Sequence, residues 1–406
     1  MFFELTVAWR NTLRQGRRTV IAVAAIAFGV TALLLAAGFI DWMFFGMREW
    51  TIRSQLGHIQ AMRPGYLANG AADPFSYLLA GNATELDTLA AMPHVAAVAP
   101  RLHFNGLVSR GEATISFIGQ GVDPAKERML SSTLQITRGE NLSAADARGI
   151  ILGQGLAANL GASVGDTVIL MATTASGGVN AVECRVLGLF ASVSKAYDDA
   201  ALRMPIATAR ALMKVKDSHT WAILLDSTDE TPRALESLRN RYAGEPLEFV
   251  PWNALADMYN KTVALFARQV DVLRFIVAAI IVLSISNAMV MNVAERTGEI
   301  GTTLALGLRR RRVLRMFLLE GLILGLVGGL VGLGLGTGLA WMISAIGIPM
   351  PPPPGMARGY TAQIAISLVL ARDALLLALA TALVASLYPA WKASRMAIVD
   401  SLRHNQ

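Results

Sequence analysis

The chain has 406 residues, of which 54% are hydrophobic and 16% are charged, and its formal net charge is +7. This composition fits an integral membrane protein that also has a sizeable water-soluble part. The single cysteine, Cys184, excludes an internal disulfide bond and a zinc site built on several thiolates.

Four long apolar runs are spread unevenly along the chain, one near its start and three in its last third. Each is close to the roughly 20 apolar residues that span a bilayer. The first is longer than the roughly 7–15 residue apolar core of a secretory signal, so we expect an uncleaved anchor. The predicted transmembrane helices cover residues 19–45, 269–294, 315–348 and 373–391.

Residues 46–268 have an ordinary mixed composition. Strand and helix patterns occur there without a repeating βαβ order, which predicts an α+β domain of two subdomains. The predicted fold class is therefore an α-helical membrane protein with four transmembrane helices, one before and three after a large extracytoplasmic α+β domain. A Pro-rich loop over 349–372 would join the last two helices on the side of that domain.

Positive charge is concentrated in short segments next to the apolar runs. Residues 1–18 carry four Arg and one Glu, and their apolar residues recur at helical spacing, which predicts an amphipathic helix at the cytoplasmic interface. The connection 295–314 and the tail 392–406 are also basic. Because short basic segments stay in the cytoplasm, we expect both termini there and the large domain outside. The net charge reflects topology and does not indicate nucleic-acid binding.

A search for catalytic and ligand motifs gives no site. No lysine follows a glycine, so the phosphate-binding GxxxxGK[ST] loop is absent from the sequence. Ser163 lies in a GxSxG pattern, but a helix pattern precedes it and a strand pattern follows, the reverse of a nucleophile elbow. His94 and His103 could approach each other, yet no HxxH pair indicates a metal. We expect no cofactor, no metal and no enzymatic activity in this chain.

Charged and small residues in the spans suggest packing roles. Glu320 and Asp41 lie near span ends, where capping or snorkelling is expected rather than proton transfer. Glycines of the third span form two rows at four-residue spacing, which permits close helix approach either inside the chain or between subunits. The rows consist of Gly321, Gly325 and Gly329, and of Gly328, Gly332 and Gly336.

The segment from Glu295 to Gly321 reads ERTGEIGTTLALGLRRRRVLRMFLLEG. Its run of four arginines cannot lie in the hydrocarbon, so a short helix and a basic loop are expected in the cytoplasm. Ile300, Leu304 and Leu308 recur every four residues and give this helix one apolar stripe. The stripe requires a partner, either a protein or the lipid surface.

This segment resembles the pattern ERxxEIGxLRALGxxRxxIxxxFLxEG of the FtsX-like permease family, which includes MacB-type efflux permeases and lipoprotein-releasing permeases. The resemblance extends over essentially the whole chain. Other matching stretches are LTVAWRNTLRQGRRTVIAVAAIAFGV from Leu5, GVDP from Gly121, IILGQGLAANLGASVGDTVIL from Ile150, MPIATARALM from Met204 and YPAWKASRMAIVDSLRH from Tyr388. One departure is Leu304, where the family usually has arginine.

The resemblance implies the permease subunit of a mechanotransmitting ABC transporter in a bacterial inner membrane. Two permeases pair, a separate cytoplasmic ATPase binds ATP with Mg²⁺, and the short helix passes its motion to the periplasmic domain. The MacB branch carries a fused ATPase domain that this sequence does not contain. The residues implied in the ATPase-coupling helix are Glu295, Arg296, Glu299, Ile300, Gly301, Leu304, Ala305, Leu306 and Gly307.

Three functions remain open at this point. Release of a lipoprotein or another amphiphile from the outer leaflet, with a periplasmic acceptor as a further partner, fits the separate ATPase. Efflux of a peptide or drug is the alternative within the family. A coupler that regulates a cell-wall hydrolase without transport is the alternative from another class. The sequence does not identify the cargo or the ATPase, and it does not distinguish a homodimer from a heterodimer.

Overall fold

The computed structural model describes residues 16–80, 83–192, 194–350 and 360–396, together with Arg10 and Arg14. The predicted amphipathic helix and most of the predicted tail fall outside these residues. The chain divides into two compact units, which are treated separately. A helical unit contains the N-terminal part up to Phe44, Thr262–Pro349 and the segment from Thr361 onward, and an α+β unit runs from Phe45 to Lys261.

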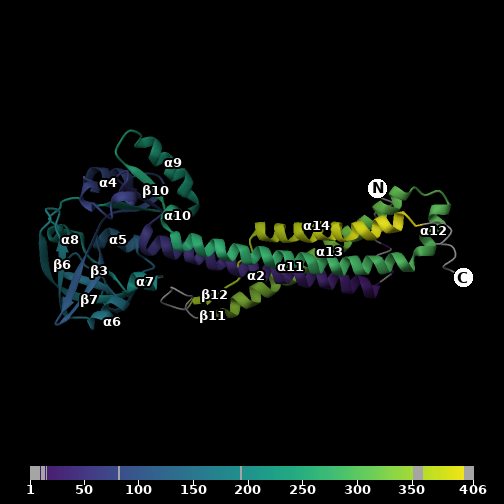
Figure 1. Ribbon diagram of the computed structural model, residues 1–406, viewed down its shortest axis with the longest axis horizontal. Coiled ribbons are helices and arrows are strands. Elements are labelled where there is room, and N and C mark those ends of the chain that lie inside the picture. Colours follow the sequence, from purple (N-terminus) through teal and green to yellow (C-terminus); the bar gives the residue numbers. More distant parts are fainter. Residues whose placement is uncertain are drawn as a thin grey trace. The chain divides into compact units, whose positions relative to one another are not determined.

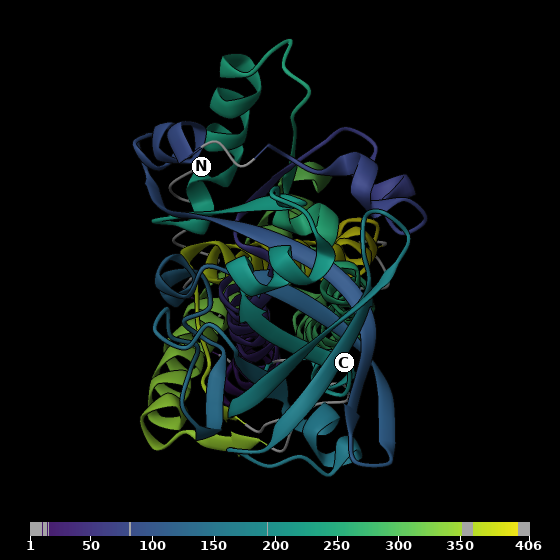
Figure 2. The same cartoon turned by 90° about the vertical axis from the view of Figure 1, so that its left-hand side faces the viewer.

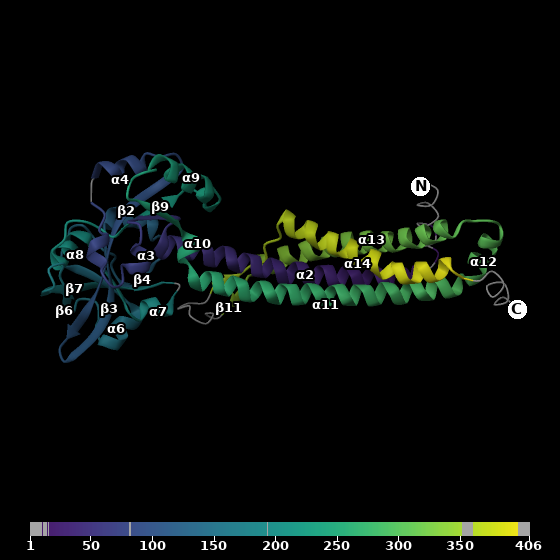
Figure 3. The same ribbon diagram turned by 45° about the horizontal axis from the view of Figure 1, so that its top comes forward.

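Four helices of the described chain are long and apolar enough to cross a membrane, which confirms the predicted arrangement of one plus three (Figure 1). They lie side by side along the helical unit, as Figures 1 and 3 agree. Their bounds are Gly16–Thr51 for α2, Asp257–Glu295 for α11, Arg310–Ile346 for α13 and Leu368–Ser394 for α14.

The helices are longer than the predicted spans. The expected basic loop up to residue 314 is already helical from Arg310, since arginine is a good helix former. The expected Pro-rich loop up to residue 372 also ends early, because Ser367 caps α14 by accepting a hydrogen bond from the Leu370 amide at 3.1 Å. Two short strands, β11 (Ile348–Met350) and β12 (Tyr360–Ala362), pair within that region.

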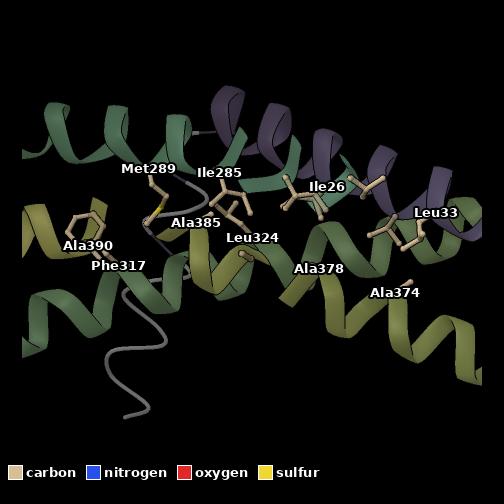
Figure 4. Packing of buried hydrophobic residues seen from close by; sticks show 14 of the residues in the cluster. Ile26, Leu33, Ile285, Met289, Phe317, Leu324, Ala374, Ala378, Ala385 and Ala390 are labelled. Carbon is tan, nitrogen blue, oxygen red and sulfur yellow. The ribbon is translucent and has the colours of Figure 1, made fainter. Parts of the chain in front are cut away.

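Side chains of all four long helices form one apolar core. Figure 4 shows residues of this cluster pointing into the space between the helices. Small side chains come mainly from α14, and larger ones from the other three helices. The labelled members are Ile26 and Leu33 of α2, Ile285 and Met289 of α11, Phe317 and Leu324 of α13, and Ala374, Ala378, Ala385 and Ala390 of α14.

The α+β unit is built on a ten-stranded sheet, which Figure 2 shows most openly. The strand order is β10-β1-β9-β2-β3-β8-β5-β7-β4, with β6 paired to β2 and β7. The pairs β3–β8 and β5–β7 are parallel, and the other registered pairs are antiparallel. The strands are β1 (Ile59–Met62), β2 (Val95–Arg110), β3 (Ala113–Val122), β4 (Gln135–Gly139), β5 (Gly149–Gly153), β6 (Thr167–Thr173), β7 (Val179–Ala191), β8 (Ala201–Pro205), β9 (Thr220–Leu225) and β10 (Glu248–Pro251).

Short helices cover this sheet. They are η1 (Ile52–Leu56), α3 (Tyr66–Asn69), η2 (Pro74–Tyr77), α4 (Ala83–Ala90), α5 (Pro124–Leu130), α6 (Gln154–Leu160), α7 (Lys195–Asp198), α8 (Ile206–Met213), η3 (Thr228–Glu230), α9 (Thr231–Arg241) and α10 (Trp252–Leu255). The predicted α+β composition is confirmed.

The α+β unit has two main apolar cores. One gathers around Trp221 and includes Leu89 of α4 and Leu238 of α9. The other includes Leu156 of α6 and Leu212 of α8. The long strand β2 contributes to both cores, so the two expected parts share one continuous sheet rather than separate sheets.

Candidate functional site: the helix between the second and third spans

The predicted coupling helix is α12, Thr297–Ala305, which lies between the end of α11 and the start of α13 (Figure 3). Thr302 and Thr303 direct their hydroxyl groups back to carbonyls one turn earlier, as threonine does inside helices. The helix ends before Gly307, whose φ of +92° is a left-handed conformation that favours glycine. A four-residue link then leads into α13.

The apolar stripe of α12 does not face a partner, and that expectation is corrected. Ile300 and Leu304 are only 3% and 9% exposed and belong to the core of the helical unit. Leu308 is half-buried against the same core. The chain's own helices bury this stripe because α12 turns it back toward Val293, Val313 and Phe317, which belong to the same cluster.

The outward face of α12 consists of other residues. Leu306 is 89% exposed, and Thr302, Ala305 and Gly307 are exposed beside it. Because the family resemblance includes Leu306 among the residues of the ATPase-coupling helix, this exposed end is the candidate contact for a partner protein. The resemblance implies Leu306 as a residue of the ATPase-coupling helix, whereas the helical periodicity points to the stripe of Ile300, Leu304 and Leu308.

Charged members of the predicted set form a connected group. Arg14 Nη2 donates to Glu299 Oε1 at 2.6 Å, and Arg296 Nε donates to Glu299 Oε2 at 3.2 Å. The hydrogen bond from Arg14 keeps the pKa of Glu299 below its ordinary value, assisted by Arg296. Glu295 and Gly301 also lie in this region, the first exposed and the second buried.

Glu320 differs from its predicted role. It is only 1% exposed, whereas a capping or snorkelling role requires a carboxylate that reaches water. Its carboxylate accepts hydrogen bonds from Arg296 Nη1 at 3.0 Å and from Asn292 Nδ2 at 3.1 Å. Burial of a carboxylate requires such partners. Arg296 lies at the start of α12 and Glu320 lies in α13, so the periodicity within one helix could not reveal their contact.

The two glycine rows of α13 face different neighbours inside the chain. Cβ atoms built at Gly321, Gly325 and Gly329 would meet Ser386, Ala382 and Leu375 of α14 at 2.8 Å or less. Cβ atoms built at Gly328, Gly332 and Gly336 would meet Ile26, Ala27 and Leu34 of α2, again at 2.8 Å or less. Each row therefore permits one close helix contact within this chain.

Two other sequence motifs occupy structural positions. Ser163 lies in the turn from α6 to β6, and its amide donates to Asp166 Oδ2 at 2.7 Å, so the elbow geometry is absent there. His103 stacks on His219 at a 6.1 Å centroid distance, not on His94. Burial lowers the pKa of His103 to about 3 and that of His219 to about 4. Within the described ranges, no group of three His, Cys, Asp or Glu could hold a metal ion.

A buried ion cluster in the α+β unit was missed by the sequence analysis. Arg101 of β2 and Arg203 of β8 both pair with Glu127 of α5, at 2.5 Å and 3.6 Å. Burial alone would raise the pKa of Glu127, but the two guanidinium groups outweigh it and hold this pKa below its ordinary value. The signal in the sequence was an arginine flanked by apolar residues in each strand, Arg101 before Leu102 and Arg203 between Leu202 and Met204.

The same arginines hold the backbone of η1. Arg101 Nη1 donates to the Gln55 carbonyl, and Arg203 Nη2 donates to the Ser54 carbonyl at 2.8 Å. On the other side, Thr228 donates to Glu49 at 2.6 Å and lies 3.0 Å from His58 Nε2. Side chains from several strands and loops thus fix the segment that follows α2.

The comparison with known families covers both units. The FtsX-like permease C-terminal family matches residues 272–398, and the MacB-like periplasmic core domain family matches residues 19–241. The second match covers more than half of the chain. The chain belongs to the FtsX/MacB-type ABC permeases. It is therefore a membrane protein with a periplasmic-type domain, of a family that works with cytoplasmic ATPases.

Individual relatives are distant. The lipoprotein-releasing system transmembrane protein LolC of Neisseria meningitidis is 26% identical over 75% of this chain and 72% of its own length. The macrolide export ATP-binding/permease protein MacB of Syntrophobacter fumaroxidans is 31% identical over 42% of this chain but only 22% of its own length. The crystal structure of the periplasmic region of MacB from Actinobacillus actinomycetemcomitans is 13% identical, with a TM-score of 0.37 over 52% of this chain and 94% of that one.

Proposed function

We propose that this chain is the permease subunit of a mechanotransmitting ABC transporter. A separate cytoplasmic ATPase binds ATP with Mg²⁺ and contacts the outward face of α12. Its closure moves the helices, and the extracytoplasmic domain then releases or extrudes a lipoprotein or another amphiphile from the outer leaflet. A second permease, either a copy or a relative, completes the membrane part.

The observation that carries this proposal is the orientation of α12. Its buried stripe fixes it to the helical unit, while Leu306 and its neighbours remain exposed at the turn before α13. A helix held firmly on one face and open on the other can receive a displacement and pass it to the spans. A lipid-facing helix would not need this exposed turn outside the spans.

The charge distribution supports the orientation in the membrane. Arg309–Arg312 are exposed at the start of α13, next to α12. Insertion of arginine at mid-bilayer costs roughly 2.5–3.5 kcal/mol per residue, so this end of the helices lies outside the hydrocarbon, and the bias of Lys and Arg toward short cytoplasmic loops favours the cytoplasmic side. Both termini are then cytoplasmic, and the α+β unit lies in the periplasm.

The relatives favour a lipoprotein cargo without fixing it. The similarity to LolC extends over about three quarters of both chains, whereas the similarity to MacB covers less than a quarter of that protein. Efflux of a peptide or macrolide-like compound is the second candidate, supported by the MacB-like periplasmic core match. A non-transporting coupler of a cell-wall hydrolase is a third, and the large two-core domain speaks against it.

Copurification tests the ATPase contact. Tagged wild-type chain is extracted gently from native membranes, and chains that carry a GxxxxGK[ST] motif are quantified by mass spectrometry. We expect one such ATPase with the wild type and a loss of at least ten-fold with Leu306→Asp, because burial of an unpaired charge costs about 1.4 kcal/mol or more. Leu67→Asp is the matched control, since Leu67 is also exposed but lies in the α+β unit. Equal recovery in all three samples would contradict the proposal.

Release assays test the cargo. Proteoliposomes that contain the chain and its ATPase are loaded with a triacylated lipoprotein, and ATP-dependent appearance of that lipoprotein in the soluble fraction is measured. A macrolide and an amphipathic peptide serve as the competing substrates. Transport of either of these, with no lipoprotein release, would assign the chain to the efflux branch.

A further inference from the structure

The helical unit contains a buried ion pair at the junction of three helices. Arg296 is the N-cap residue of α12 and directly follows α11, and Glu320 lies in α13. Their side chains are 12% and 2% exposed, and both carboxylate oxygens of Glu320 are engaged, one by Arg296 and one by Asn292. Ionisable residues inside a span are rare and usually functional.

Arg296 has further partners that belong to different elements. Its guanidinium carbon lies 5.7 Å from the ring centroid of Phe317 in α13, and its Nε donates to Glu299 on α12. Glu299 is in turn half-exposed and shared with Arg14. One guanidinium thus connects a buried carboxylate of α13 with an exposed carboxylate of α12.

The chain segment that joins α12 to α13 is a weaker mechanical connection than the side-chain contact between Arg296 and Glu320. The link from Leu306 to Arg309 is largely exposed, and it contains Gly307 with its left-handed φ. Exposed ion pairs contribute little and are screened, whereas a buried, fully hydrogen-bonded pair resists separation. We therefore expect a displacement of α12 to break the contacts of Glu299 before the contact between Arg296 and Glu320.

We propose that Arg296 is a positioning residue that makes α12 and α13 move as one body through its buried pair with Glu320. This inference rests on the proposed function for its purpose, since a displacement of α12 by an ATPase is what the pair would transmit. Stability alone does not require the pair, because buried ion pairs can often be replaced by apolar residues without loss. A directional side-chain link is what the apolar replacement would lack.

Distances between spin labels on α12 and α13 test the inference in the full chain without any partner. Labels are attached at Thr302→Cys and Gly334→Cys, because Thr302 is exposed and no atom lies within 4 Å of a Cβ at Gly334. Cys184 stays in place, since it is buried and burial raises the pKa of its thiol to about 12. The labelled chain is measured in lipid nanodiscs by double electron–electron resonance.

We expect a narrow distance distribution in the labelled parent. Glu320→Gln should widen it, and the double variant Arg296→Met/Glu320→Met should widen it while it keeps the parent's melting temperature. Asp271→Asn is the matched control, because it removes the acid of an exposed ion pair on α11, Asp271 with Arg274, and should leave the distribution unchanged. An unchanged distribution in a folded double variant would overturn the inference.

A second arm adds the copurified ATPase and ATP with vanadate. The distance between Thr302 and Gly334 should stay constant in the parent and shift in the double variant, where only the non-directional apolar contacts of Ile300 and Leu304 still join α12 to the core. A shift of equal size in both would also overturn the inference. Failure of any ATPase to bind the unlabelled wild type would instead contradict the proposed function and leave the result of the first arm intact.

Discussion

Two buried ion clusters in the described part of the chain differ in what their arginines contact. In the α+β unit, Arg101 and Arg203 share one carboxylate, and each also donates to a backbone carbonyl of η1. In the helical unit, the guanidinium group of Arg296 contacts Glu299 of α12 and both Glu320 and Phe317 of α13. The first cluster fixes a backbone segment in one conformation. The second connects two helices and leaves their backbones free to move together.

The largest effect of a single substitution is expected in the cluster of the α+β unit. Glu127→Gln leaves two buried guanidinium groups without their shared countercharge and should lower the free energy of unfolding by about 3–5 kcal/mol. Denaturant unfolding in detergent, followed by tryptophan fluorescence, measures it, because Trp221 is buried in this unit. The control is Glu183→Gln, an exposed carboxylate of the same unit. Equal destabilisation by both variants would show that the cluster holds nothing in place.

The close packing of α13 against α2 should be sensitive to an added side chain. Gly332→Leu forces a side chain against the Ala27 carbonyl of α2, which a Cβ would already approach to 2.7 Å. Overpacking of this kind costs about 1–3 kcal/mol. The melting temperature of the detergent-solubilised chain should fall, while Gly334→Leu, where a Cβ meets nothing within 4 Å, should leave it unchanged. A similar response of both glycines would contradict the assigned helix contact.

The stabilities of the two units are expected to respond differently to acidification. Burial lowers the pKa of His58 to about 4, as it does for His219, and the pKa of His103 to about 3. Since these folded-state pKa values lie below the unfolded value of about 6.5, the unfolded chain binds more protons and stability falls as the pH drops below it. Each histidine should cost about 2 kcal/mol at pH 5.

The described part of the helical unit contains no histidine, so this loss should be confined to the α+β unit. In a variant whose tryptophans outside that unit are replaced by phenylalanine, tryptophan fluorescence should therefore change between pH 7 and pH 5, before the helical circular dichroism signal does. The triple substitution of His58, His103 and His219 by glutamine should remove the difference in pH between the fluorescence change and the circular dichroism change. Simultaneous loss of the fluorescence and circular dichroism signals in the variant that retains these histidines would contradict this prediction.

Ser163→Ala gives the smallest expected effect, which is none. Ser163 contributes its amide to Asp166 in a turn, and its hydroxyl has no catalytic geometry. Melting temperature and lipoprotein release should equal those of the wild type. Loss of activity in a normally folded variant would restore a hydrolase function to consideration.

Much of the fold was accessible from the sequence, since long apolar runs and helix periodicity depend on neighbours along the chain. The four long helices, the α+β composition and the turn at Ser163 follow from such local patterns. The direction of the Ile300–Leu304 stripe did not, because periodicity predicts that a stripe is buried but not what buries it. The pairs Arg296–Glu320 and Arg101–Glu127 depend on contacts between distant segments, which a single sequence does not encode visibly.

The proposed function requires that the exposed end of α12 contacts an ATPase. Leu306→Cys and Leu330→Cys each present an exposed thiol, the second on the membrane-spanning part of α13, where Leu330 is 52% exposed. Each is labelled with a photoreactive maleimide in native membranes, illuminated and analysed by mass spectrometry. We expect a crosslink from position 306, but not from position 330, to a chain with the GxxxxGK[ST] motif. Crosslinks from position 306 to lipid alone, or equal crosslinks to that chain from both positions, would contradict it.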